Sequence, residues 1–292
     1  TGLAMGGNKT RMFEFALADA LQKGADTVVA GSAVQSNYCR QLSAACAKLG
    51  LELHLVLRPV RPVDRVDQQG NNLLQRLLGA HVTVIREYDH ASQKEAILAK
   101  IAEQEALGKK VYWPRQADTI DLDAIAYAES ALEVVQQCRA LDIDPSHFYL
   151  CALDTTQAGV GLGLSFLQSA MHVRGICPMK DVPQRCEEMA QIANSGAQRL
   201  GLNLQLHGSD FDNDDSFVGE RYGLPTPAGL DALRTVARTE GILLDPVYTS
   251  KAMSALFEHI REGQLDANRP VVFLHTGGNP ALFAYAADVL DS

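Results

Sequence analysis

The feature that most constrains this chain is a regular alternation of short apolar runs with longer amphipathic segments. The short runs are rich in β-branched residues, and they predict strands at 27–30, 51–57, 81–85, 111–113, 148–152, 173–177 and 271–275. Helical periodicity is expected at 36–49, 69–78, 92–107, 122–140, 157–171, 185–200, 228–240, 250–262 and 281–290. Such an order is typical of βαβ units. It predicts an α/β fold with open, twisted parallel sheets and helices on both faces.

Charge and cysteine usage narrow the classes of partner. The 292 residues carry a formal net charge of −9, which argues against nucleic acid as a partner. No apolar run approaches a membrane span and no signal peptide is visible, so we expect a cytoplasmic protein that does not bind membranes. Six scattered cysteines without a CxxC pair predict free thiols, and the histidine spacing predicts no metal site.

One stretch is unusually acidic, with Asp210, Asp212, Asp214, Asp215 and Glu220 close together. The favoured interpretation is a solvated loop. A metal site is the alternative, although the stretch lacks the Asp and Gly spacing of a calcium loop.

A lysine directly follows a glycine-rich turn near the start of the sequence, in Met5-Gly6-Gly7-Asn8-Lys9. Glycines allow the backbone to approach a ligand closely. A lysine held there can be desolvated, which lowers its pKa and provides an amine nucleophile for an aldehyde such as pyridoxal phosphate (PLP). The alternative is an exposed turn lysine without a catalytic role.

Polar clusters follow three of the predicted strands, at Gln35-Ser36-Asn37, Asp154-Thr155-Thr156 and Thr276-Gly277-Gly278. In open parallel sheets, ligands bind beyond the carboxyl ends of the strands. Backbone N–H groups at a helix N-terminus also attract anions. From the residues alone, Ser36 is read more readily as an N-cap than as a ligand contact.

Several longer segments, taken together, resemble one enzyme family. They are Gly70-Asn71-Asn72-Leu73-Leu74, Tyr222-Gly223-Leu224-Pro225, Leu244-Asp245-Pro246-Val247-Tyr248-Thr249-Ser250-Lys251 and His275-Thr276-Gly277-Gly278-Asn279-Pro280. With the lysine turn and the Gln-Ser-Asn cluster, these segments resemble the D-cysteine desulfhydrase / 1-aminocyclopropane-1-carboxylate deaminase family. That family belongs to the PLP-dependent enzymes of the tryptophan-synthase-β type (fold type II).

The resemblance implies two domains and a dimer. A small domain would span 12–120, and a large cofactor-binding domain would comprise 1–11 and 121–292. In the family the lysine lies several tens of residues from the start of the chain, so we expect the family's opening segment to be missing from this sequence. The implied partners are a small amino-acid substrate and a second copy of the chain.

The resemblance also implies catalytic and substrate-binding roles. Lys9 would bind PLP as a Schiff base and move the α-proton of the substrate. Gln35 and Ser36 would hold the substrate carboxylate, with Ser36 counted among the catalytic residues. Tyr222 and Tyr248 would line the pocket and assist proton transfer.

Further residues would hold the cofactor. Asn37 would bond the ring hydroxyl of PLP and lie beside the substrate. Thr276 would bond the pyridine nitrogen as a neutral partner, while Thr155, Thr156 and Gln157 would contact the phosphate.

The sequence departs from the family at the phosphate loop, where Asp154 stands in place of glycine. A carboxylate about 4–5 Å from a phosphate costs roughly one kcal/mol near water and several at low dielectric. Asp154 with Gln157 also reads as a capping box. Either the phosphate is held differently, or the protein has drifted from PLP chemistry. A second departure covers 113–119, where Arg115 could offset Asp154.

The sequence therefore predicts a PLP-dependent lyase that eliminates a β-substituent from a small amino acid, as D-cysteine desulfhydrase does. One alternative is a non-catalytic binder with a degenerate phosphate cup. Another is a lyase or deaminase for a sulfonated or cyclopropane amino acid, with Arg115 of interest for an acidic substrate. Thr249 argues against the cyclopropane substrate, since deaminases of the family carry glutamate there.

Overall fold

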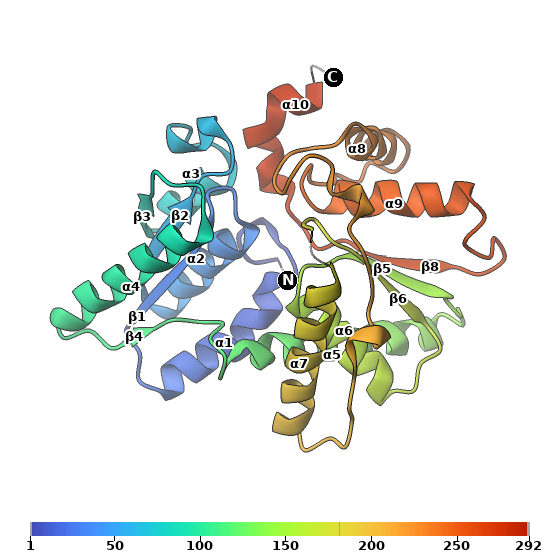
Figure 1. Ribbon diagram of the computed structural model, residues 1–292, viewed down its shortest axis with the longest axis horizontal. Coiled ribbons are helices and arrows are strands. Elements are labelled where there is room, and N and C mark those ends of the chain that lie inside the picture. Colours follow the sequence, from blue (N-terminus) through green and yellow to red (C-terminus); the bar gives the residue numbers. More distant parts are fainter. Residues whose placement is uncertain (1, 181, 291–292) are drawn as a thin grey trace. The chain divides into compact units, whose positions relative to one another are not determined.

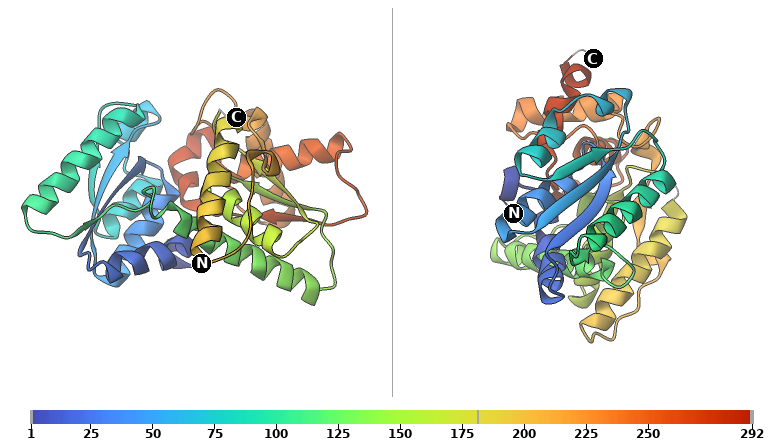
Figure 2. Two further views of the ribbon diagram at one scale, coloured as in Figure 1. Left: turned by 60° about the horizontal axis from the view of Figure 1, so that its bottom comes forward. Right: turned by 90° about the vertical axis from the view of Figure 1, so that its left-hand side faces the viewer.

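The computed structural model describes residues 2–180 and 182–290 and contains two parallel sheets. The first sheet has the order β3-β2-β1-β4, with every pair of neighbours parallel. Its strands are β1 (Thr27–Ala33), β2 (Glu52–Arg58), β3 (His81–Val84) and β4 (Val111–Tyr112). The helices between them are α1 (Lys9–Gln22), α2 (Asn37–Leu49), α3 (Gly70–Leu77) and α4 (His90–Ala106). Helix α4 covers one face of this sheet and α2 the other, with α1 beside α2 (Figures 1 and 2).

The second sheet is also fully parallel, in the order β7-β6-β5-β8. It comprises β5 (His147–Cys151), β6 (His172–Ile176), β7 (Asp212–Asp214) and β8 (Val271–Leu274). Its helices are α5 (Ile120–Ala140), α6 (Thr155–Phe166), α7 (Val182–Arg199), α8 (Pro227–Glu240) and α9 (Thr249–Arg261). Short elements complete the chain: η1 (Leu3–Met5), η2 (Pro62–Arg65), η3 (Gly208–Asp210), η4 (Ser216–Val218), η5 (Asn279–Tyr285) and α10 (Ala286–Leu290). These parallel sheets with helices on both faces confirm the predicted fold class.

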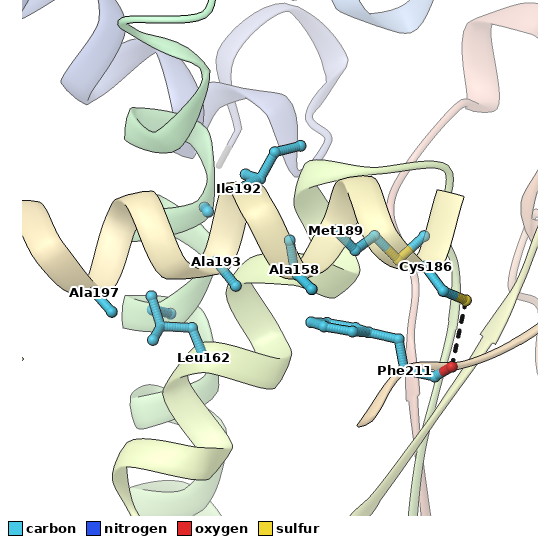
Figure 3. Packing of buried hydrophobic residues seen from close by; sticks show 11 residues of the cluster. Ala158, Leu162, Cys186, Met189, Ile192, Ala193, Ala197 and Phe211 are labelled. Carbon is cyan, nitrogen blue, oxygen red and sulfur yellow. Dashed lines mark hydrogen bonds between the residues drawn. The ribbon is translucent and has the colours of Figure 1, made fainter. Parts of the chain in front are cut away.

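The core of the second unit depends on a close approach of α5 and α6. A β-carbon added at Gly163 would lie 2.6 Å from the carbonyl oxygen of Ala128, so only glycine allows this spacing. Glycine at 159 faces the carbonyl of Ala124 in the same way. The glycines at 159 and 163 therefore serve helix packing. Side chains from α6 and α7, including Leu162 and Met189, fill the adjoining core (Figure 3).

The backbone contacts divide the chain into two units at boundaries that differ from the predicted domains. One unit holds the residues through Gln116 together with the segment that begins at Gly277, and the other holds Ala117–Thr276. The prediction had placed 1–11 and the C-terminal segment in the larger domain. The difference arises at the start of the chain because the Arg40 guanidinium of α2 donates to the carbonyl oxygens of Ala4 and Gly6.

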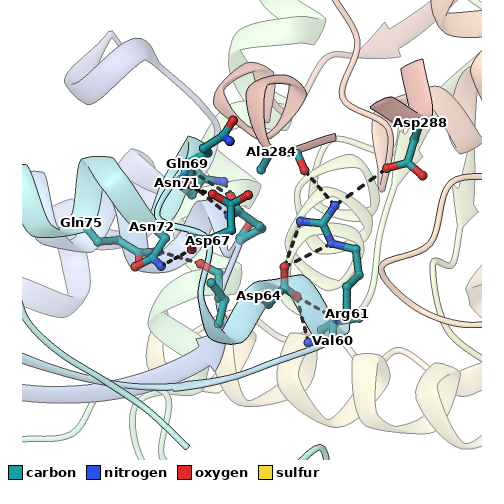
Figure 4. Close-up of polar contacts among 12 residues, drawn as sticks. Val60, Arg61, Asp64, Asp67, Gln69, Asn71, Asn72, Gln75, Ala284 and Asp288 are labelled. Atoms are coloured by element: carbon teal, nitrogen blue, oxygen red, sulfur yellow. Dashed lines mark hydrogen bonds and ion pairs between the residues drawn. The ribbon is translucent and has the colours of Figure 1, made fainter. Parts of the chain in front are cut away.

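The C-terminal segment returns to the first unit and is held there by Arg61. The guanidinium of Arg61 donates to the carbonyl oxygen of Ala284 at 2.8 Å, and its carbon lies 3.7 Å from the ring centroid of Tyr285. Asp64 binds the other side of this guanidinium, with N–O distances of 3.1 and 2.9 Å (Figure 4). We call Arg61 and Asp64 the clasp.

Strand β7 lies inside the acidic stretch, which corrects the expectation of a solvated loop. Asp212–Asp214 pairs with β6, and the carboxylate of Asp212 accepts from His172 and Arg174 on that strand. The sequence pattern hid this strand because acidic residues are rare in strands. Cross-strand cations offset the charge here. The six cysteines are free and buried, and none of the described helices is long and apolar enough to span a membrane.

A buried lysine in α9 makes the stability of the second unit depend on pH. Lys251 is fully buried, with Nζ 2.6 Å from the carbonyl oxygen of Val218, and burial lowers its pKa from 10.5 to about 8. The pKa of Lys251 is lower in the folded protein than in the unfolded chain. Between these two pKa values the unfolded chain therefore binds more protons than the folded protein does. Stability therefore rises with pH in this window. Relative to Lys251→Met, we expect the wild-type free energy of unfolding to increase by about 2 kcal/mol from about pH 7.5 to about pH 9.5.

Denaturant unfolding across this pH range measures the effect. Lys48→Met is the matched control because Lys48 is exposed at the end of α2. Equal pH dependence in Lys251→Met and wild type would contradict the prediction.

Candidate active site

The glycine turn before α1 places Lys9 as the first residue of that helix. Gly7 has φ +130°, and a β-carbon there would lie 2.5 Å from the amide nitrogen of Gln41, so the turn requires glycine. Lys9 is partly buried, and its Nζ donates to Oδ1 of Asn8 at 3.3 Å. The backbone around this amine is thus closely packed.

Two residues of α2, which the sequence analysis did not single out, hold the segment that carries Lys9. The fully buried Arg40 donates through Nη2 to the carbonyl oxygen of Gly6 at 2.9 Å. Gln41 accepts from both the backbone N–H and the hydroxyl of Thr10 at 3.1 Å. Burial lowers the pKa of Arg40 to about 10, so the guanidinium remains charged at neutral pH.

The N-terminus of α2 is capped by Ser36. Its Oγ accepts from the backbone N–H of Cys39 at 3.2 Å, as the N-cap interpretation predicted. The Ser36 hydroxyl is also a donor, and that hydrogen is not used in the cap. The cap and a ligand contact are therefore compatible.

Asn71 in α3 links the predicted substrate residues, and the sequence analysis missed this role. Its amide nitrogen donates to the carbonyl oxygen of Gln35 at 2.9 Å and to Oδ1 of Asn37 at 2.8 Å. Its own oxygen accepts from Arg40 Nε at 2.8 Å. Because Oδ1 of Asn37 is an acceptor here, the N–H groups of Asn37 are kept as donors. The Gly70-Asn71-Asn72 segment was the available signal.

The side chain of Gln35 is also committed to α3. Its nitrogen donates to the carbonyl oxygen of Gln69 at 3.0 Å, and its oxygen accepts the backbone N–H of Asn71 at 2.9 Å. The structure thus brings Gln35, Ser36 and Asn37 together around one helix N-terminus. The segment that carries Lys9 is tied to the same helix, because Gln41 bonds the neighbouring Thr10.

In the second unit, Tyr222 and Tyr248 share a hydrogen bond between their hydroxyl groups. Their rings stand edge to face with centroids 6.0 Å apart. Burial is the main reason that the pKa of Tyr248 lies well above its usual value, and the neighbouring Tyr222 adds to it. Tyr248 therefore stays protonated at neutral pH and can act as a donor.

Asp245 fixes the turn that carries Tyr248, another role that sequence reasoning missed. This buried carboxylate accepts the backbone N–H groups of Val247 and Tyr248 at 3.0 Å and that of Thr249 at 2.8 Å. The hydroxyl of Thr249 donates to Asp245 at 2.8 Å, so Thr249 is part of this cap. The Asp245-Pro246 pair in the sequence was the only signal.

The N-terminus of α6 carries an anion supplied by the chain itself. The Asp154 carboxylate accepts the backbone N–H of Thr155 at 2.5 Å. The predicted capping box does not form, because Gln157 donates to the carbonyl oxygen of Asp212 at 2.7 Å and accepts from Asn213 at 2.6 Å. Thr155 and Thr156 are buried in the first turn.

Thr276 is partly buried and follows β8 by two residues. Its neighbour His275 bonds the carbonyl oxygen of Leu243 at 2.8 Å. Thr276 is also the last residue of the second unit before the chain returns at Gly277.

The structure distributes the predicted residues between the two units. Lys9, Gln35, Ser36 and Asn37 lie in the first, and the others lie in the second.

These features define a class: an α/β enzyme with a partly buried lysine and helix N-termini suited to anions. The chain belongs to the family described as pyridoxal-phosphate dependent enzyme, whose profile matches residues 2–277. It is 37% identical to the D-cysteine desulfhydrases of Salmonella typhi and Salmonella typhimurium over 290 residues, covering 98% of this chain and 86% of each relative.

A solved structure of an ACC deaminase homologue is 30% identical, with a TM-score of 0.89 over 99% of this chain and 85% of that one. The structure of O-ureido-L-serine synthase, at 20% identity and a TM-score of 0.67 over 98% of this chain and 85% of that one, shares the fold. The chain is thus a PLP-dependent enzyme of fold type II. The relatives support lyase chemistry, namely elimination or deamination.

The residues of the first unit suit PLP. Among the residues that the structure describes, Asn8 Nδ2 and Asn279 Oδ1 are buried without a hydrogen-bond partner. Leaving such atoms unpaired costs about 1–3 kcal/mol each, which a polar ligand would relieve. Gly277 also needs to be glycine, because a β-carbon there would lie 2.7 Å from the Cα of Gly7. The N-terminus of α6 fits PLP less well, because the carboxylate of Asp154 already accepts the backbone N–H of Thr155 there.

Proposed function

We propose that this protein eliminates the β-substituent of a small amino acid, as D-cysteine desulfhydrase does. With cysteine and water, the products would be pyruvate, ammonia and hydrogen sulfide. The 37% identity to D-cysteine desulfhydrases over 98% of the chain is the observation that carries the proposal. The proposal extends to a homodimer in the cytoplasm, which size-exclusion chromatography with light scattering and cell fractionation would test.

In this proposal PLP, when bound, withdraws electrons from the substrate's α-carbon and so acidifies the α-proton. Lys9 Nζ removes that proton. The N-terminus of α2, with Gln35, Ser36 and the N–H groups of Asn37, binds the substrate carboxylate or the ring hydroxyl.

The roles proposed for the second unit complete the set. Tyr248 donates its hydroxyl proton to the departing β-substituent, and Tyr222 returns a proton to Tyr248 through their shared hydrogen bond. Thr276 bonds the pyridine nitrogen. Thr155 would bind the phosphate with its hydroxyl, because its backbone N–H is bonded to Asp154, and Thr156 would bind it with its hydroxyl and backbone N–H. Since the side chain of Gln157 is bound to β7, any contact of Gln157 with phosphate would come from its backbone N–H.

The direct test supplies purified, PLP-loaded protein with D-cysteine and, separately, with L-cysteine. Pyruvate and sulfide are then measured, and turnover should release them in equal amounts. We expect turnover of D-cysteine. If the protein is saturated with PLP but releases no pyruvate from either enantiomer of cysteine, the proposed substrate is wrong. 1-Aminocyclopropane-1-carboxylate and a sulfonated amino acid serve as additional substrates for the alternatives.

A second candidate function, a non-catalytic binder, is favoured by the bond between Asp154 and the Thr155 N–H. An aspartate at this site competes with a phosphate for the same donors and repels it. We expect Asp154→Gly to tighten PLP binding by about 5- to 100-fold, which corresponds to about 1–3 kcal/mol. Titration of the apo protein with PLP, followed by absorbance, measures the affinity.

Two further variants sharpen this prediction. Asp154→Asn removes the charge but keeps the side-chain length, so it separates repulsion from steric closure. Asp89→Gly is the matched control, because Asp89 caps α4 in the first unit through Ser92 at 2.8 Å. An unchanged affinity in Asp154→Gly would favour an altered but functional phosphate site. A large gain, together with an inactive wild type, would favour the non-catalytic binder.

A further inference from the structure

Two histidines and a glutamate meet at the edge of the first sheet, outside all of the residues discussed so far. His54 on β2 and His81 on β3 are directly paired in the register of the two parallel strands. Their rings stack with centroids 4.7 Å apart and planes 19° from parallel. Glu52 precedes His54 by two residues on β2, so its side chain lies on the same face of the sheet.

The three ligand atoms converge on a small volume. Oε1 of Glu52 lies 2.8 Å from Nε2 of His54 and 3.8 Å from Nε2 of His81. All three groups offer an atom within 4.8 Å of the other two. Zn–N and Zn–O bonds of about 2.0–2.2 Å in a tetrahedral site separate neighbouring ligand atoms by roughly 3.3 Å. The required shifts are therefore a few tenths of an ångström to about one ångström, within reach of side-chain rotation.

We propose that Glu52, His54 and His81 form a binding site for a divalent transition metal ion of the Zn²⁺ type. Two imidazoles and one carboxylate are a donor set for zinc with a fourth, open position, and imidazole disfavours Mg²⁺ and Ca²⁺. The His54 side chain is only 11% exposed while that of His81 is 63% exposed, so the ion has a firm ligand on one side and an entry on the other.

A neighbouring lysine holds the Glu52 carboxylate in an orientation that suits metal binding. Lys109 Nζ lies 2.7 Å from Oε2 of Glu52 and leaves Oε1 facing the histidines. A bound ion would tie the short edge strand β3 to β2.

The second sheet provides a matched comparison. His147 and His172 are likewise register partners on neighbouring parallel strands, and His172 lies 2.5 Å from the Asp212 carboxylate. In that cluster Arg174 bonds the same carboxylate oxygen, which places a fixed cation at the position that an ion would need. We expect no comparable site there.

The test uses EDTA-treated, dialysed full-length protein without PLP, titrated with Zn²⁺ by calorimetry and with Co²⁺ by visible absorbance. The expected result is one ion per chain, a Co²⁺ spectrum of a low-coordinate nitrogen and oxygen site, and a metal-dependent rise in Tm. His81→Ala and His54→Ala should each weaken binding by about 10-fold or more. His172→Ala should leave the affinity unchanged.

Two outcomes would overturn the proposal: no binding at micromolar to sub-millimolar Zn²⁺, or binding that is unchanged in both His81→Ala and His54→Ala. Should either variant fold poorly, Glu52→Gln and His81→Gln provide conservative replacements of the same ligands. None of these residues belongs to the proposed catalytic set, so pyruvate release from D-cysteine serves as a separate readout. Loss of metal binding with retained turnover distinguishes this site from the proposed active site.

Discussion

Replacing Lys9 with alanine is expected to reduce pyruvate release by about 10³-fold or more, because it removes both the amine nucleophile and the proposed base. The variant should also lose the visible absorbance of lysine-bound PLP. The fold should persist, since the segment around Lys9 is held by Arg40 and Gln41 through the backbone of Gly6 and Thr10.

The measurement combines steady-state pyruvate release, the absorbance spectrum after addition of PLP and circular dichroism. Lys48→Ala, on the exposed end of α2, is the matched control and should resemble wild type. A Lys9→Ala protein that retains both turnover and the PLP band would remove Lys9 from its proposed role. Loss of circular dichroism would instead reveal a structural role for the side chain.

Asp64→Ala is expected to lower the free energy of unfolding by about 3–5 kcal/mol, because it removes the carboxylate that bonds the buried Arg61 guanidinium and leaves the half-exposed Asp288, 3.8 Å away, as its remaining counter-ion. Asp64 is 2% exposed and also accepts the backbone N–H groups of Val60 and Arg61 at 3.0 and 2.8 Å. Loss of the clasp should further weaken the hold of Arg61 on Ala284, and so loosen η5 and α10 (Figure 4).

Urea unfolding measures the stability, and hydrogen exchange across 279–290 reports on the local loosening. Asp231→Ala is the matched control, because Asp231 and Arg234 form an exposed pair with the same sequence spacing at 3.3 Å. Exposed pairs contribute only about 0–1 kcal/mol. An Asp64→Ala variant no less stable than Asp231→Ala would show that the clasp is dispensable. An Arg61→Met, Asp64→Leu double variant should recover part of the loss, since neither charge is then buried alone.

Much of the architecture was accessible from the sequence because it depends on local pattern. Seven strands and the helices between them appeared as apolar runs and helical periodicity, and the structure places them close to the predicted ranges. Strand β7 was missed because its stability comes from cross-strand cations that the local sequence does not contain.

The site was only partly accessible. The family resemblance pointed to Lys9, Ser36 and the tyrosines, whose catalytic roles stay predictions, and the N-cap role of Ser36 followed from residue type. Asn71 and Asp245 were missed as organising residues because the sequence does not show whether an amide or a carboxylate faces water or bonds several groups of the protein. The ends of the units also differed from prediction, since Arg40 and Arg61 reach segments distant in the chain.

The sequence by itself determined the parallel α/β class, the family and the lysine expected to carry the cofactor. Hydrophobic periodicity and the order of the motifs can be read directly from the sequence. Only the tertiary structure decided that Gln157 bonds β7 instead of forming a capping box with Asp154, that Arg61 holds the returning segment, and that His54 and His81 lie side by side. The physical reason is strand register. Residues 27 positions apart become neighbours only when two parallel strands align, and no local pattern encodes that alignment.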